Sequence, residues 1–500
     1  MRPIFTVMSD TRPTLVLAGA AGFIGQALAT ALHARFRVVG LSRSARRADA
    51  HVDEYRRCDL FNLREADAGL AGADYAVYLV HSMMPSARLT QGSFADMDLI
   101  CADNFARAAK RAGVRQIVYL GGLIPAAQTQ RGPLSAHLRS RLEVERTLGR
   151  YGTPVTALRA GIILGAHGSS FQILLRLVRR LPLMVLPAWT QTRTQPVALA
   201  DVVALLSFVV GQRACFGRSF DVGTPETVSY AELMTRLAAQ LGRPLKALPV
   251  PLISPKLSRL WISLVTGAPR ALVEPLIESL RHEMVARDHA LATLAGRAPT
   301  PLDAALGQAL ADAGRDQPRA FARAPLVDAP LVRSVQRMRL PAGRDAAWAA
   351  GEYARWLPRG LRGLIRVDVD NGGTCRFFLA GVGLELLVLR PAPERSSPDR
   401  QLYFIDGGRL AHLPQRGRFE LRQLFDGRTL MTAIHDYQPR LPWALYVGSQ
   451  ALVHRWVMWA FARHLRGQHS VADPVLRHVL AGPTDHAGQA RAESAPPALS

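Results

Sequence analysis

Apolar and polar positions follow two alternating patterns in the first third of the chain. Short apolar runs rich in β-branched residues, typical of strands buried on both faces, are separated by longer segments with apolar residues at helical spacing. Strands that alternate with helices predict βαβ units, and therefore the α/β class with a doubly wound parallel sheet. Strands are expected at residues 14–18, 37–41, 75–80, 116–120 and 155–159, and helices at 22–34, 94–112 and 134–151.

The pattern becomes more helical between about residues 153 and 313. Helices are expected at 229–241, 255–266 and 270–285, and they predict a helical lobe from about residue 226 that covers the open end of the sheet. Residues 314–330 are rich in Arg, Asp, Ala and Pro and show little periodicity, which predicts a linker. A first domain over residues 1–313 follows from these patterns.

A third pattern begins at residue 331. One strand and one helix are followed by six short strands with turn sequences between them and by a long helix, which predicts a separate α+β domain over residues 331–467. After residue 467 the composition becomes polar and predicts a disordered tail, 468–500. The expected strands are 333–340, 364–369, 375–379, 384–389, 402–406, 417–425 and 429–436, and the expected helices are 344–357 and 442–465.

A glycine-rich turn joins the first expected strand to the first expected helix. The strand ends at Gly19, the helix begins near Gly22, and a third glycine follows at Gly25. A pyrophosphate needs backbone N–H groups without side-chain obstruction, and the helix N-terminus adds a favourable dipole. A tight turn without a ligand is the alternative, but this context favours a Rossmann-type dinucleotide site. The residues expected to contact the cofactor here are Gly19, Ala20, Ala21, Gly22, Phe23, Ile24 and Gly25.

The end of the second expected strand indicates which dinucleotide binds. NAD-specific sites place Asp or Glu there for the ribose hydroxyls, whereas this chain has Ser42 and Arg43. These two residues, assisted by Arg46 or Arg47, suit a 2′-phosphate. A solvated basic loop is the alternative. We therefore expect NADP(H), with NAD(H) as the second choice.

The GxxGxxG spacing and four further segments resemble the extended and atypical short-chain dehydrogenases/reductases. The segments are Cys58–Leu60, Leu79–Ser82, Gly121–Leu123 and Arg159–Ile162. The resemblance implies that Asp59 and Leu60 lie at the adenine and that Val80 and His81 lie at the adenosine ribose. It also places Gly121 where these enzymes usually carry a catalytic serine, and the last segment at the nicotinamide.

Longer matches are similar to a narrower bacterial group. The segments YLVHSM (78–83), HLRSR (137–141), LRAGIILG (158–165) and TRTQPVAL (192–199) resemble NmrA-like atypical reductases fused to a START/polyketide-cyclase-like (SRPBCC) domain of unknown function. The resemblance implies NAD(P) binding and an apolar pocket for a lipid or quinone-like ligand beside the C-terminal helix. The alternative is an aromatic core made by the helix residues Trp443, Tyr446, Trp456, Trp459 and Phe461.

The catalytic residues of these reductases are not conserved in kind here. The family uses a tyrosine as proton donor and a lysine four residues later, and the matching positions in this chain are His137 and Arg141. In one hypothesis His137 is a substitute general acid, because an ordinary histidine pKa suits that role, and Arg141 binds ribose or phosphate. In the other, the site binds nucleotide without turnover.

Composition and charge limit the other function classes. The net charge is +23, but the arginines are scattered and no nucleic-acid-binding motif is found, so no nucleic-acid partner is expected. The four cysteines lie far apart, which predicts neither a disulfide framework nor a metal site and suits a reducing cytoplasm. No signal peptide or spanning helix is expected.

Two basic amphipathic segments leave a peripheral membrane contact open as an alternative to packing in the lobe. They are residues 171–181 and 252–264, and such a contact would be at the inner membrane surface. The sequence does not indicate an oligomeric state. The leading hypothesis is an NADP(H)-dependent oxidoreductase acting on a small hydrophobic molecule, and the alternative is a non-catalytic NADP(H)-binding redox sensor or scaffold.

Overall fold

The computed structural model divides the chain into two compact units. They are Met1–Val335 and Gln336–Ser500, and the division falls inside one strand, β15 (Val332–Arg339). Each unit is described by itself below. The structure describes residues 11–81, 89–126, 133–180, 183–243, 246–250, 262–315, 331–412, 417–424 and 427–480.

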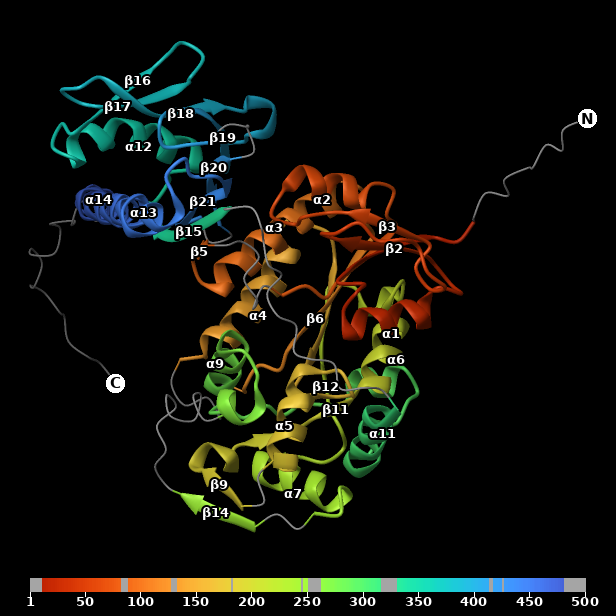
Figure 1. Cartoon of the computed structure of the whole chain (residues 1–500). Helices are drawn as coiled ribbons and strands as arrows, with labels where there is room; N and C mark the ends of the chain where they lie inside the picture. The colour runs from red at the N-terminus through yellow and green to blue at the C-terminus, as the bar shows by residue number, and fades with distance from the viewer. Residues whose placement is uncertain are drawn as a thin grey trace, which may run out of the picture. The chain divides into compact units, whose positions relative to one another are not determined.

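A seven-stranded parallel sheet forms the centre of the first unit (Figure 1). The five strands expected from the apolar runs are present, and two more lie at its edges. These edge strands are short, and the one at residues 54–57 is polar, so neither carries the apolar run of a central strand. In spatial order the strands are β12 (Ser219–Val222), β7 (Val155–Ala160), β6 (Gln116–Gly122), β4 (Tyr75–Tyr78), β1 (Thr14–Ala18), β2 (Arg37–Ser42) and β3 (Glu54–Arg57).

Helices cover both faces of this sheet, which confirms the doubly wound α/β prediction (Figure 1). On one face α1 packs against α6, and their side chains share a core with β1, β2 and β7 that includes Leu17, Leu28 and Leu206. On the other face α2, α3 and α4 pack in a row. The bounds are α1 (Phe23–Leu32), α2 (Leu63–Leu70), α3 (Phe94–Arg111), α4 (Ala136–Leu148) and α6 (Leu199–Val209).

A second apolar core lies under the helical lobe. It is formed by residues of α5, α7, α9 and α11, among them Phe171, Leu233, Ile277 and Leu306. The lobe helices are α5 (Ser169–Arg180), α7 (Tyr230–Gln240), α9 (Arg270–Ser279), α10 (Ala290–Leu294) and α11 (Leu302–Arg315). The short strands are β5 (Leu89–Gln91), β8 (Ile163–Leu164), β9 (Leu183–Pro187), β10 (Arg193–Thr194), β11 (Val197–Ala198), β13 (Val228–Ser229) and β14 (Lys246–Val250), and the single turns are η1 (Ala188–Gln191) and η2 (Arg213–Cys215).

The expected helix at 270–285 is too long. α9 ends at Ser279, because the following backbone bonds elsewhere: the Gln195 amide donates to the Met284 carbonyl over 2.8 Å, and the Ala286 amide donates to the Gln195 side chain over 2.8 Å. Most of the helix expected at 255–266 and of the linker at 314–330 lies outside the described residues, although 262–266 are helical.

The second unit has an antiparallel sheet, β16 to β21 in sequence order, with β15 beside β21. Helix α12 packs on it, and α14 contacts α12 through an aromatic cluster: the Phe461 ring lies 5.1 Å from Tyr353 and 5.2 Å from Trp356. The bounds are β16 (Ile365–Val369), β17 (Cys375–Leu379), β18 (Leu384–Pro391), β19 (Arg400–Gly407), β20 (Arg418–Gln423), β21 (Thr429–Tyr437), α12 (Ala346–Gly360), η3 (Pro393–Arg395), α13 (Trp443–Gly448) and α14 (Gln450–Leu480).

The C-terminal helix differs from the prediction in two respects. A break at Ser449, with φ −131° and ψ −83°, separates α13 from α14. α14 then continues to Leu480, into the segment 468–500 expected to be disordered, because apolar residues recur at helical spacing beyond residue 467. Among the helices that the structure describes, none has the length and apolar character needed to cross a bilayer.

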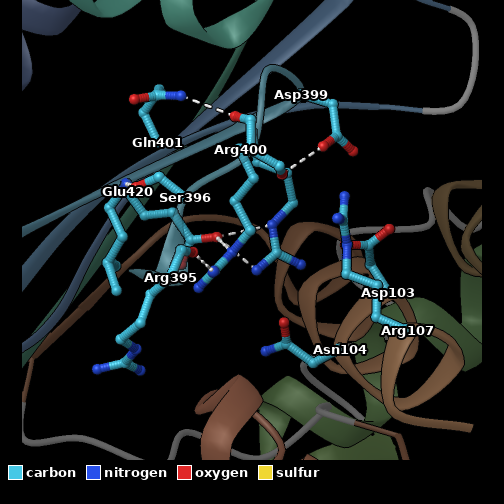
Figure 2. A network of polar contacts seen from close by, with 12 residues as sticks. Asp103, Asn104, Arg107, Arg395, Ser396, Asp399, Arg400, Gln401 and Glu420 are labelled. Atoms are coloured by element: carbon cyan, nitrogen blue, oxygen red, sulfur yellow. Dashed lines mark hydrogen bonds and ion pairs between the residues drawn. The ribbon is translucent and has the colours of Figure 1, made fainter. Parts of the chain in front are cut away.

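Charged side chains are buried on strands β19 and β20 of the second unit, and Figure 2 shows two of them, Arg400 and Glu420. Glu420 pairs with Arg400 at 2.7 Å and with Arg422 at 2.5 Å. Burial alone would favour the neutral carboxyl, but the two guanidinium groups hold the Glu420 pKa well below its usual value. The cluster therefore stays ionised, and removal of either arginine would leave a buried charge less compensated.

Candidate functional site

The carboxyl ends of β1, β2, β3 and β4 surround a cavity of about 670 Å³ in the first unit. In the sheet, β2 lies on one side of β1 and β4 on the other, so the chain crosses over at β1. Ligands of doubly wound folds bind at such a crossover. The lining residues are Ala18, Gly19, Ala21, Gly22, Leu41, Ser42, Arg43, Ser44, Arg46, Cys58, Asp59, Leu60, Phe61, Leu79, Val80, His81, Cys101 and Arg333.

The turn between β1 and α1 requires its glycines. Gly19 has φ +95°, a conformation that side chains disfavour, and its carbonyl accepts a hydrogen bond from the Gly22 amide over 2.9 Å. A Cβ at Gly25 would lie 2.1 Å from the Gly19 oxygen. Gly19 and Gly22 thus shape the cavity wall, whereas Gly25 allows the helix to approach the strand.

The N-terminus of α1 offers unpaired backbone donors to this cavity. Its N-cap is Gly22, and no described side chain caps it, nor does an acidic residue occupy its first turn. By contrast, Asn62, Ser93 and Ser135 cap α2, α3 and α4 with side-chain hydrogen bonds. Helix amides without an acceptor are the donors that bind phosphate groups.

The side chains of the turn residues predicted to touch a cofactor lie in different places. Ala20 and Gly25 are buried, and Ile24 packs against the core of the sheet. The Phe23 ring lies 6.3 Å from the ring of His167, at the edge of the lobe. Of the predicted turn residues, Gly19, Ala21 and Gly22 line the cavity.

The loop after β2 supplies positive charge. Ser42, Arg43 and Arg46 all line the cavity, and Arg43 and Arg46 are exposed to solvent. The Arg46 guanidinium lies 6.0 Å from the centre of the Tyr55 ring. This wall is therefore basic where an NAD-specific site would carry a carboxylate.

The opposite wall carries an ion pair that sequence reasoning missed. Asp59 follows β3, and its carboxylate pairs with the Arg333 guanidinium at 2.5 Å. Arg333 also lies 4.3 Å above the Phe61 ring. It comes from β15, 274 residues along the chain from Asp59, so no local pattern could indicate it. Arg333 neutralises a carboxylate that lines the cavity.

Residues after β3 and β4 complete the wall of the cavity. Leu60 lines the cavity, and its carbonyl accepts a hydrogen bond from the Asn104 side chain over 2.8 Å. Val80 and the exposed His81 follow β4 and line the cavity as well. Gly121, at the end of β6, does not line it; a Cβ there would lie 2.9 Å from the Tyr119 ring, so packing requires this glycine.

Arg141 is buried and paired inside the protein. Its guanidinium forms a buried ion pair with Asp98 of α3, and the Ser140 hydroxyl donates to the same carboxylate over 3.3 Å. The expected role of Arg141 on ribose or phosphate would need this pair to open. The pair fixes α4 against α3 instead.

Burial disfavours the imidazolium form of His137 near neutral pH. Burial, together with the charge of Arg141 one turn away, lowers the His137 pKa to about 3. The expectation of an ordinary histidine pKa at this position is therefore wrong. The neutral ring can accept a proton or hydrogen bond, and it lines a second, apolar cavity.

The second cavity has a volume of about 140 Å³ and lies within the first unit. Gly122, Ala160 and Gly161 form its wall at the ends of β6 and β7, and lobe side chains form the rest. Its few polar groups include Tyr230, whose pKa burial raises to about 12, so that the hydroxyl stays protonated. The other lining residues are His137, Leu138, Ile162, Ser170, Ile173, Leu174, Leu177, Trp189, Met234, Ile262, Val273, Leu276, Ile277, Ser279, Leu280 and Met284.

Comparison with known proteins agrees with the glycine-rich turn. Residues 19–174 match a family of NAD(P)H-binding domains. The auxiliary protein GraX of Staphylococcus aureus is 31% identical over 146 residues, which are 29% of this chain and 43% of that protein. The chain thus spans less than half the length of this relative.

Several solved structures are similar to about three fifths of the chain at low identity. A nucleoside-diphosphate-sugar epimerase from Staphylococcus aureus is 18% identical, with a TM-score of 0.48 over 59% of this chain and 99% of that one. An NADPH-dependent quinone oxidoreductase from Escherichia coli, complexed with NADPH, is 18% identical, with a TM-score of 0.47 over the same shares. A Citrobacter triphenylmethane reductase is 18% identical, with a TM-score of 0.46 over 60% of this chain and 99% of that one.

The fold and the glycine-rich turn of the first unit agree with the family match over residues 19–174. The first unit contains an NAD(P)H-binding domain with a Rossmann-like parallel sheet.

Proposed function

We propose that the protein binds NADP(H) in the 670 Å³ cavity and is an oxidoreductase for a small apolar molecule held in the 140 Å³ cavity. The observation that carries the proposal is the position of the apolar cavity. It reaches the ends of β6 and β7, in the same sheet whose neighbouring strands β1 and β4 line the nucleotide cavity. Ligands and cofactors of such folds meet along this edge.

The charges of the nucleotide cavity support NADP(H) over NAD(H). The α1 amides suit the pyrophosphate, and Arg43 and Arg46 suit a 2′-phosphate. The Asp59 carboxylate would repel that phosphate, but Arg333 neutralises the carboxylate. The balance of this wall therefore favours the more highly charged nucleotide.

The chain contributes binding and orientation more than proton transfer. The cofactor, when bound, supplies the hydride chemistry. The apolar walls exclude water from the substrate, and the neutral His137 ring and the Tyr230 hydroxyl offer hydrogen bonds to a carbonyl-like or quinone-like oxygen. The proton needed to complete a reduction comes from solvent as the product leaves the cavity, rather than from an imidazolium.

NADPH oxidation measured with a panel of quinones and aldehydes tests the proposal. We expect turnover of small planar apolar compounds, and Trp189→Ala, which widens the apolar cavity, should change KM more than NADPH affinity. His137→Phe, which removes one hydrogen bond to the substrate oxygen, should lower turnover by up to about tenfold. Tight NADPH binding without turnover on any compound would exclude the enzyme and favour a second function.

That second function is a non-catalytic NADP(H) sensor. It is favoured by the internal pairing of Arg141 with Asp98 and by the suppressed His137 pKa, which remove the charged groups of the usual proton relay. In this case NADPH and NADP⁺ should bind with different affinities and leave the apolar cavity empty. Calorimetry with both forms measures this difference.

We also propose that the second unit is a START/polyketide-cyclase-like domain. The antiparallel sheet and the long C-terminal helix support that proposal. We also propose a cytoplasmic location for the whole protein.

A further inference from the structure

Helices α13 and α14 expose apolar and aromatic side chains that the aromatic-core expectation places inside. Tyr446 and Phe461 are buried as expected, but Trp456 is 53% exposed and Trp459 is 54% exposed. The aromatic-core expectation is therefore wrong for these two tryptophans. Four aliphatic side chains are exposed with them: Leu445, Val447, Leu452 and Val453.

The exposed side chains form one continuous stripe along α14. Leu452, Trp456, Trp459, Arg463 and Arg466 follow each other at intervals of four, three, four and three residues, and all five are exposed. Such spacing places side chains on one face of a helix. The face buried in the second unit carries a different set: Ala451, Met458, Phe461 and Leu465. α14 thus has two apolar faces. One packs in the second unit, and the other is exposed to solvent.

The charge of this stripe is purely positive. Arg463 and Arg466 in the stripe and Arg455 beside it are exposed, and the Arg463 guanidinium lies 5.9 Å from the centre of the Trp459 ring. The sequence contains no Asp or Glu between Asp436 and Asp473. An exposed surface of tryptophan, aliphatic side chains and arginine complements an anionic lipid headgroup layer: the rings and aliphatic groups enter the boundary, and the guanidinium groups meet the phosphates.

We propose that the exposed face of α13 and α14 binds an anionic lipid surface and holds the protein at a membrane without crossing it. A second copy of the chain is the competing occupant, because the same spacing can build a helix pair. Pairing two such faces would bring the arginines of both copies together, and no Asp or Glu lies between residues 443 and 467 to offset them. Charge therefore favours the lipid surface.

Sedimentation of the full chain with vesicles tests the proposal. One set contains phosphatidylcholine alone and the other also contains about a third phosphatidylglycerol. We expect strong binding to the anionic vesicles, loss of binding in high salt, and a blue shift of tryptophan emission with quenching by brominated lipid chains. Equal or absent binding to both vesicle types would overturn the proposal.

Two variants separate the apolar and charged contributions. Trp456→Ser with Trp459→Ser should abolish the emission shift and most of the binding. The triple variant Arg455→Gln, Arg463→Gln, Arg466→Gln should weaken binding to anionic vesicles about a hundredfold, since each basic residue near such a surface contributes about a factor of five. The matched control removes three exposed arginines elsewhere in the same unit, Arg339, Arg359 and Arg409, and should bind as the unmodified chain does.

Mass measurement by light scattering distinguishes the competing occupant. A concentration-dependent dimer that the double tryptophan variant abolishes, together with absence of lipid binding, would assign the face to a second copy and overturn the proposal. Because the substituted side chains are exposed, the melting temperatures of these variants should stay close to that of the unmodified chain. This inference does not depend on the nucleotide site.

Discussion

The two cavities of the first unit are built in different ways. The nucleotide cavity is formed mainly by backbone and loop residues at the ends of β1 to β4, and most of its lining lies between residues 18 and 81. The apolar cavity is formed by side chains drawn from residues 122 to 284 and from both the sheet and the lobe. A ligand site made of backbone leaves a compact sequence motif, whereas a site made of packed side chains does not.

The strongest way to break the nucleotide cavity is to add one carbon to its turn. Gly25→Ala places a Cβ 2.1 Å from the Gly19 oxygen, so α1 must move away from β1. We expect NADPH affinity to fall by more than about a hundredfold, since the phosphate donors are displaced with the helix. Calorimetry measures the loss. Gly314→Ala, in α11 where a Cβ would meet open space, is the control and should bind normally.

The positive loop tests nucleotide choice. Arg43→Ala with Arg46→Ala should weaken NADPH binding by about tenfold to a hundredfold, as expected for lost charge-assisted hydrogen bonds, and leave NADH binding almost unchanged. Titration with both nucleotides gives the ratio. Arg47→Ala serves as a control, because Arg47 belongs to the same loop but does not line the cavity. Equal losses for NADPH and NADH would contradict the 2′-phosphate assignment.

The Asp59–Arg333 pair tests whether a distant strand contributes to the cavity. Arg333→Ala leaves the Asp59 carboxylate uncompensated, and we expect about a tenfold loss of NADPH affinity from an unpaired charge in the wall. If neutralisation is the role of Arg333, adding Asp59→Asn should restore most of the affinity. A double variant as weak as the single one would show that Arg333 acts on the nucleotide directly.

These cases also show how far the sequence could lead. The central strands, the glycine turn and Ser42 and Arg43 were predictable, because each depends on neighbours within a few residues. Arg333, Trp189 and Tyr230 were not, because tertiary packing alone brings them to a cavity. The exposure of Trp456 and Trp459 was missed for a related reason: helical spacing shows that side chains share a face, but not which face the sheet covers.

The smallest expected effect concerns His137 and its dependence on pH. Its folded pKa of about 3 lies below the unfolded value near 6.5, so the unfolded chain binds the proton more tightly. The free energy of unfolding should therefore be insensitive to this group above pH 6.5 and fall as pH decreases from 6.5 towards 3, by about 1–2 kcal/mol at pH 5.

Replacing His137 by Leu should flatten that part of the stability curve relative to the unmodified chain and leave NADPH affinity within about twofold. Denaturant unfolding at pH 5 and pH 7.5 measures the difference, and the His454 side chain, whose pKa burial lowers to about 4, contributes equally to both proteins. If instead the rate of NADPH oxidation followed a titration near pH 6.5 that His137→Leu removed, His137 would be an acid after all. The apolar cavity would then have to admit water when substrate binds, because burial against its walls is what keeps the His137 ring neutral.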